Sequence, residues 1–184
     1  MQFLAELWLP IVLSAVAVFV LSALFHTVVP FHNREWRGLN GEPAVLDALG
    51  KAAPTPGLYM MPFTTQDGMK DPEWQARIAR GPVAFLTVMP NGMRPMAPML
   101  AMSFVHNLIV AVFVGYVASH TIALDADYLT VFRVTGTITF MAYALGQIPD
   151  SVWFGRPWKS YVLIAMDGLA YALVTAGIFG WRWS

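Results

Sequence analysis

The sequence predicts an all-α integral membrane protein, a bundle of four transmembrane helices with a long cytoplasmic loop that contains short helices. Two observations lead to this prediction. Of the 184 residues, 57% are hydrophobic and only 12% are charged, which is about half the charged fraction of a typical soluble domain. A chain of this size keeps much of its surface exposed, so lipid has to solvate part of it. In addition, four apolar stretches are each close to the roughly 20 residues that a helix needs to cross a bilayer.

The four predicted spans cover 7–29, 97–118, 129–148 and 158–181, all within a single membrane domain, 1–184. The first span is not read as a signal peptide, because no basic residue precedes it and no small-residue cleavage pattern closely follows it. Tryptophans lie near the predicted span ends, where their amphipathic rings favour the depth of the lipid headgroups. Residues 30–96 form the long loop.

Two short helices are predicted inside this loop. Glu42-Pro43 to Gly50 and Asp71-Pro72 to Gly81 each begin with a proline in the first turn and end at a glycine, which is typical of helix starts and stops. The second of these places Trp74 on one face with arginines beside it. That pattern suits either a helix in the membrane interface or an ordinary helix packed on the loop. Residues 83–88 indicate a short extended run.

The placement of lysine and arginine predicts the orientation of the chain. The 30–96 loop holds seven of these residues and the connection after the third span holds two. The N-terminal segment and the loop between the second and third spans hold none, and the C-terminus holds one. We therefore expect the basic side to be cytoplasmic and both termini to lie on the other side.

Ionisable side chains inside spans are costly and are therefore functional candidates. Asp167 and His106 enter their spans from the same side, and we expect both at a depth of roughly 12–14 Å. A buried aspartate beside a histidine can form a charge-assisted hydrogen bond, hold a proton or orient a cofactor ligand. The alternative is structural: Asp167 bonds His106, Asn107, Tyr143 or another neighbour and locks the bundle.

Two further ionisable residues lie in the predicted spans. Arg133 is close enough to its span end for its long stem to reach the interface or the acidic residues of the adjoining loop. His26 lies near the cytoplasmic end of the first span, and His32 follows just beyond it. Two histidines from different helices are the minimum for a b-type haem, but His26 and His106 differ in depth by roughly 9 Å. A bound tetrapyrrole, with His106 as its single axial ligand, is therefore the less favoured reading, and no metal site is predicted.

The fourth span contains a regular pattern of small residues, which we call the small-residue ridge. Residues of this kind at every fourth position let helix backbones approach closely in lipid. The ridge predicts a tightly packed neighbouring helix, from the same chain or from another. Its members are Gly168, Ala172, Ala176 and Gly180.

The segment Asp167–Trp181, which reads DGLAYALVTAGIFGW, resembles the last span of small four-helix bacterial membrane proteins of no known activity. The resemblance covers roughly a tenth of the chain. It implies an α-helical bundle in a bacterial inner membrane, so that the termini would be periplasmic. It brings no activity and no functional residue with it.

The function expected from these features is that of a non-catalytic accessory or assembly subunit of a larger respiratory or photosynthetic membrane complex. The sequence has no phosphate-binding glycine loop, zinc-protease helix or nucleophile elbow, and its balanced charge does not suggest nucleic acid. We expect other transmembrane subunits or further copies as partners, and lipids as ligands. The alternative is a small transporter or proton-handling protein that uses Asp167 and His106.

Overall fold

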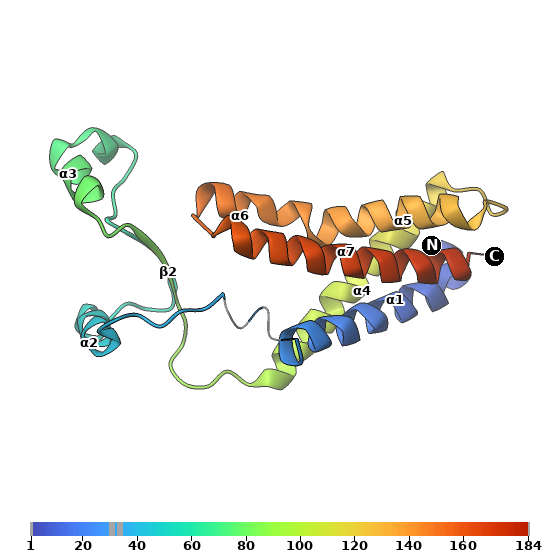
Figure 1. The fold of residues 1–184 in the computed structure, drawn as a ribbon, viewed down its shortest axis with the longest axis horizontal. Coiled ribbons are helices and arrows are strands. Elements are labelled where there is room, and N and C mark those ends of the chain that lie inside the picture. Colours follow the sequence, from blue (N-terminus) through green and yellow to red (C-terminus); the bar gives the residue numbers. More distant parts are fainter. Residues whose placement is uncertain (1, 30–31, 33–34, 184) are drawn as a thin grey trace. The chain divides into compact units, whose positions relative to one another are not determined.

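Four long helices dominate the structure, a computed structural model that describes residues 2–29, 32 and 35–183 (Figure 1). Three of them, and the helical stretch Tyr128–Trp153, are long and apolar enough to cross a membrane. The four apolar helices that the sequence predicts are therefore confirmed as helices. The long helices are α1 (Gln2–Thr27), α4 (Met96–Thr121), α5 (Tyr128–Tyr143) and α7 (Trp158–Trp181).

The third apolar stretch is not the continuous helix predicted over 129–148. α5 ends at Tyr143, and a short 3₁₀ turn, η3 (Leu145–Gln147), leads into α6 (Ile148–Trp153). Pro149 is the physical cause, since it has no amide hydrogen and its ring would clash with the carbonyl of Leu145 in a regular helix. The backbone therefore tightens before Pro149, which lies in the first turn of α6, where a proline fits.

The four long helices form a closed ring in which α1 packs against α4 and α7, and α5 packs against the same two helices. One half of this bundle has an apolar core. The core comes from the first half of α1, the start of α5, and the last half of α4 and α7 with the residues that follow them. Its buried members are Leu7, Ile11, Ala15, Ala111, Val114, Ala118, Ile122, Val131, Phe179 and Trp183.

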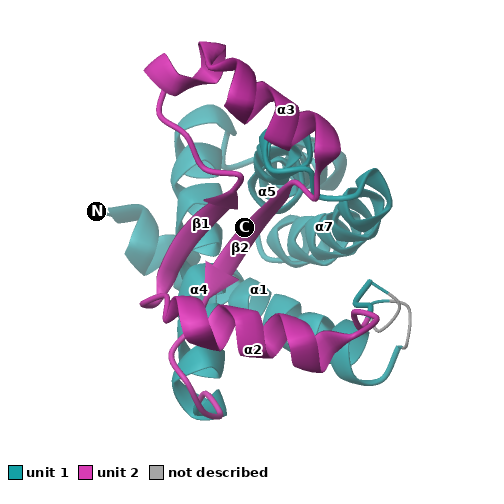
Figure 2. Ribbon diagram, turned by 90° about the vertical axis from the view of Figure 1, so that its left-hand side faces the viewer, with its two compact units in different colours: residues 1–37, 95–184 teal, residues 38–94 magenta. Residues whose placement is uncertain are grey.

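By its contacts the chain divides into two compact units, 1–37 with 95–184, and 38–94, which Figure 2 colours separately. The second unit contains a two-stranded antiparallel sheet with Gly57 opposite Val88 and Met61 opposite Ala84. The all-α prediction missed this sheet, because its first strand, GLYMM, has no alternation of polar and apolar residues to mark it. The elements of this unit are α2 (Glu42–Ala52), β1 (Gly57–Met61), η2 (Asp67–Lys70), α3 (Pro72–Arg80) and β2 (Ala84–Val88).

The contacts of α3 bear on whether this helix lies in the membrane interface or packs on the loop. Asp71 caps α3 by accepting a hydrogen bond from the amide of Glu73. Trp74 is half-buried, and its indole N–H donates to the carbonyl oxygen of Pro62 at 3.3 Å. Ile78 on the same face is half-buried as well. The apolar face of α3 therefore packs within its own unit, which favours an ordinary loop helix over an interfacial one.

Candidate functional site

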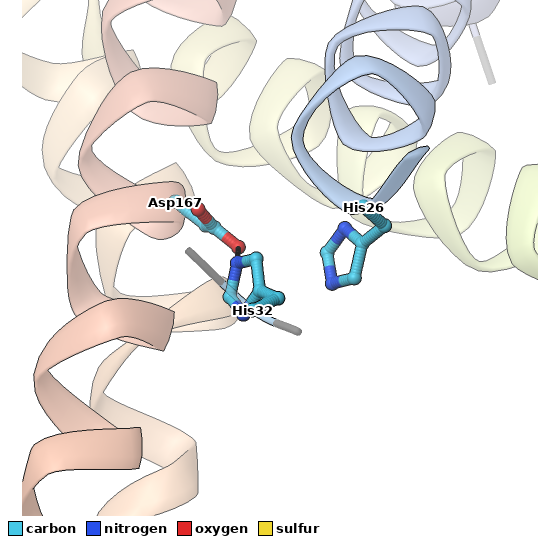
Figure 3. Close-up of side chains that lie close together, drawn as sticks. All are labelled: His26, His32 and Asp167. Carbon is cyan, nitrogen blue, oxygen red and sulfur yellow. Dashed lines mark hydrogen bonds and ion pairs between the residues drawn. The ribbon is translucent and has the colours of Figure 1, made fainter. Parts of the chain in front are cut away.

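The first unit brings His26, His32 and Asp167 together at one point (Figure 3). His26 lies in the last turn of α1, Asp167 lies on α7, and His32 comes from the segment that follows α1. The potential ligand atoms of the three side chains all lie within 4.8 Å of one another. Asp167 is buried, His32 is half-buried and His26 is exposed. We call these three residues the His–Asp cluster.

His32 is held between two carboxylates. Its Nε2 lies 2.9 Å from Oδ2 of Asp167, and its Nδ1 lies 3.1 Å from Oε1 of Glu35. Both ion pairs are shielded from water, since the exposed fractions of the three side chains are 11% for His32, 7% for Asp167 and 16% for Glu35. The contact with Asp167 ties His32 to α7.

The hydrogen bonds of His32 define the charge of the group. An ionised carboxylate can only accept, so both ring nitrogens of His32 must carry a hydrogen when Asp167 and Glu35 are ionised. One imidazolium and two carboxylates leave a net charge of −1. A net negative charge among partly shielded groups is one that a bound cation can offset.

The orientation of His26 leaves one ring nitrogen available. Its Nδ1 lies 2.9 Å from the carbonyl oxygen of Ser22, and a carbonyl can only accept, so Nδ1 is the donor. In the neutral ring Nε2 then carries a lone pair. The His26 ring is stacked on the His32 ring, with 4.4 Å between the ring centroids and 6° between the planes. This spacing leaves no room for a macrocycle between the two rings, so they cannot be the two axial ligands of a haem.

Asp167 has an acceptor atom that the protein does not satisfy. Its Oδ1 is buried and finds no hydrogen-bond partner among the residues that the structure describes. Leaving a buried polar atom without a partner costs on the order of 1–3 kcal/mol. The cluster therefore combines an unsatisfied carboxylate oxygen with an imidazole lone pair, and Glu35 places a second carboxylate beside it, which together suit a cation.

The predicted pair of Asp167 and His106 does not form. Asp167 is bonded to His32 instead, and His106 is an exposed residue whose ring meets Tyr143 edge-on at 5.7 Å. Tyr143 donates a hydrogen bond to Oδ1 of Asn107 at 3.0 Å. The depth estimate compared residues inside the spans only, whereas the partner of Asp167 is His32, which lies beyond the end of α1.

Arg133 is exposed on α5. The ion pairs found among the described residues do not include one between Arg133 and Asp125 or Asp127. Asp127 instead caps α5 by accepting hydrogen bonds from the amides of Leu129 and Thr130. The structure thus leaves Arg133 outside the His–Asp cluster.

The small-residue ridge of α7 packs on α5 of the same chain. A Cβ atom added to Gly168 would lie 3.0 Å from the Cβ of Ala144, and one added to Gly180 would lie 2.7 Å from the ring of Tyr128. These contacts occupy both ends of the ridge. The neighbour that the sequence left undefined is therefore an internal helix, and the ridge requires no second chain.

Sequence reasoning identified Asp167 and His26 but missed the roles of His32 and Glu35. A signal was present in the spacing, because His32 and Glu35 are three residues apart and follow an intramembrane histidine closely. Their meaning depends on the path of the chain after α1, which no local pattern specifies. Comparisons with protein-family models, curated proteins and solved structures found no match for this chain.

Proposed function

We propose that this chain is a multi-pass membrane protein that binds a cation at its His–Asp cluster without conducting it across the bilayer. The four apolar helices support membrane insertion, because their outward faces carry exposed apolar side chains along most of their length. In keeping with the distribution of lysine and arginine, the 38–94 unit faces the cytoplasm of a bacterial cell and both termini face the periplasm.

The observation that carries cation binding is the buried, unsatisfied Oδ1 of Asp167. Asp167 belongs to the His–Asp cluster, in which a ligand atom of His26 lies within 4.8 Å of one of its own. Ionisable side chains within a membrane are normally paired with another polar or charged group. A bound cation supplies the missing partner here, whereas a purely structural Asp167–His32 bond leaves Oδ1 unexplained.

The apolar core argues against conduction. A transported ion needs polar groups or water along its whole path, and the His–Asp cluster lies at one end of α1. Beyond it, the opposite half of the bundle contains the apolar core, into which Ser14 brings only a buried hydroxyl group. The cluster therefore serves as a binding site that opens to one side only.

The test is the thermal stability of the purified full-length protein in detergent with a panel of Na⁺, K⁺, Mg²⁺, Ca²⁺, Mn²⁺, Co²⁺ and Zn²⁺. A ligand at 100 times its dissociation constant stabilises the folded state by about 2.7 kcal/mol, so at least one cation should raise the unfolding temperature by several degrees. Asp167→Asn should abolish this shift and His106→Ala should retain it. The proposal fails if no cation stabilises the wild type more than Asp167→Asn.

Flux measurements test the absence of conduction. Proteoliposomes that contain the wild type should leak protons and the bound cation no faster than protein-free vesicles. A flux that Asp167→Asn removes would instead support the transporter alternative.

An accessory or assembly role in a larger membrane complex is our proposal for the setting in which the site acts. The exposed large apolar side chains on α1, α4 and α7 support it, because such surfaces can contact other transmembrane helices as well as lipid. The small-residue ridge no longer supports it, since α5 covers the ridge.

A further inference from the structure

We infer that the cation is a divalent transition-metal ion of the Zn²⁺ class, bound by Nε2 of His26, Nε2 of His32 and a carboxylate oxygen of Asp167. This inference rests on the proposed cation binding and names the chemistry of the ligand. It follows from the types of donor atom, from their distances and from the groups that hold the two imidazole rings.

The donor set selects the class of metal. Two imidazole nitrogens and one carboxylate suit zinc, iron, nickel or copper, whereas magnesium and calcium prefer oxygen ligands alone. The chain has no cysteine, so thiolate sites are excluded. Three protein ligands leave at least one position of a tetrahedral ion for water or another ligand, and His26 lies on the exposed side of the cluster.

The distances are compatible with a small closure around an ion. Ligand atoms of a tetrahedral zinc ion lie about 3.3 Å apart, given bonds of about 2.0–2.1 Å. The ligand atoms of the His–Asp cluster lie within 4.8 Å of one another, so the most distant pair has to close by about 1.5 Å to come into range. His26 is the exposed member of the cluster, so its ring, which lies near that of His32 (Figure 3), is the one with most room to move.

The two imidazole rings are already oriented for metal binding. A metal-ligating histidine usually donates its second ring N–H to a carbonyl or a carboxylate, which fixes its tautomer. His26 points Nδ1 at the carbonyl of Ser22, and His32 points Nδ1 at the carboxylate of Glu35. Nε2 of His32 points at Asp167, and Nε2 is the ring nitrogen of His26 that the Ser22 contact leaves available. On binding, the metal takes the place of the hydrogen on Nε2 of His32, and one proton is released to solvent.

The test is a titration of the tag-free, chelator-stripped full-length protein with Co²⁺, whose visible absorption reports its coordination. We expect one equivalent to give the strong absorption of a four- or five-coordinate ion, and Zn²⁺ to displace it. His26→Ala should abolish this absorption. Glu35→Gln, which weakens only the support of His32, should reduce the affinity by roughly 10- to 100-fold.

His120→Ala is the matched control. His120 also ends a long helix and also directs Nδ1 at the carbonyl four residues earlier, that of Tyr116 at 2.8 Å, but it lies outside the cluster. Its replacement should leave the titration unchanged. Because His26 is exposed, His26→Ala should still fold, and an unchanged unfolding temperature without metal would show this.

The outcomes separate the two proposals. A Co²⁺ spectrum typical of the hexa-aqua ion, or one that His26→Ala leaves intact, overturns the transition-metal inference. If Mg²⁺, Ca²⁺, Na⁺ or K⁺ nevertheless stabilises the wild type and not Asp167→Asn, cation binding itself stands. If no cation has any effect, both proposals fail.

Discussion

Asp167 illustrates how a single buried charge constrains its surroundings. Its carboxylate meets the imidazole of His32 at 2.9 Å, in a region where both side chains are largely shielded. Removing one partner of a buried ion pair destabilises a protein much more than replacing both partners by apolar residues, because the remaining charge is left buried and unpaired. The energetic coupling of these two residues can therefore be measured directly.

We expect His32→Ala to lower the free energy of unfolding by about 3–5 kcal/mol, since it leaves Asp167 buried without a partner. In an Asp167→Asn background the same change should cost much less, because the charge is absent. The measurement is a double-mutant cycle in mixed detergent micelles without added metal. Equal costs of His32→Ala in the two backgrounds would contradict a direct interaction. His120→Ala, which removes an exposed histidine, should have little effect in either.

At the scale of the elements, the pair formed by α5 and α7 depends on small residues. Among the ridge glycines, Gly168 lies closest to the backbone of a neighbouring segment. A Cβ added there would lie 3.0 Å from the Cβ and 3.3 Å from the amide nitrogen of Ala144. Backbone cannot move aside as readily as the half-exposed ring of Tyr128 near Gly180. The ridge is therefore most sensitive at its Gly168 end.

Gly168→Ala should destabilise the bundle by about 1–3 kcal/mol, the usual range for overpacking. Gly177→Ala is the control on the same helix, because its Cβ would meet only the Tyr128 hydroxyl at 3.8 Å. That substitution should be neutral or slightly stabilising, as alanine favours helix more than glycine does. The measurement is reversible unfolding in detergent, and equal effects of the two substitutions would disprove close packing at Gly168.

The start of α5 gives a prediction about pH. Hydrogen bonds to Asp127, chiefly from the hydroxyl of Thr130 at 2.7 Å, lower the pKa of this carboxyl below its usual value. A lowered pKa in the folded state contributes stability above the unfolded-state pKa of about 3.9, and this stability is lost as the pH falls through the folded-state value. Wild type should therefore lose more stability between pH 6 and pH 3 than Asp127→Asn. Unfolding curves at each pH test this difference, and parallel profiles would contradict it.

At the scale of the whole molecule, the absence of cysteine allows topology to be mapped with single substitutions. Gly50→Cys places a thiol where an added Cβ meets nothing within 4 Å, and Asp125→Cys places one in the exposed turn between α4 and α5. With a membrane-impermeant maleimide on intact cells, we expect labelling at position 125 and none at position 50. Lysed cells should be labelled at both. The reverse pattern in intact cells would invert the proposed orientation.

The proposed accessory role predicts that the protein is bound to other subunits in its native membrane. Native mass spectrometry of the protein released from its own membrane in mild detergent should give a mass well above 20.3 kDa, with foreign subunits that can be identified. A lone monomer, or an assembly of this chain alone, would contradict the accessory role. It would leave cation binding untouched.

Composition and apolar runs were enough to predict the helical, apolar character of the bundle and the approximate positions of its four long helices, although not the break before Pro149. These are local properties, because each apolar run is by itself long enough to cross a bilayer. Pro149 interrupts the helix and Asp127 caps α5, and each does so within one turn of its own position. The sequence also marked Asp167 as a costly charge and showed the ridge on α7.

Which groups meet one another depends on the tertiary structure. Depth along straight helices favoured His106 as the partner of Asp167, but the structure pairs Asp167 with His32, whose other ring nitrogen meets Glu35. Likewise, the spacing of the ridge residues could not say which helix would cover them, and the pairing of β1 with β2 joins segments more than twenty residues apart. Contacts of this kind depend on the path of the chain in space, which local periodicity does not encode.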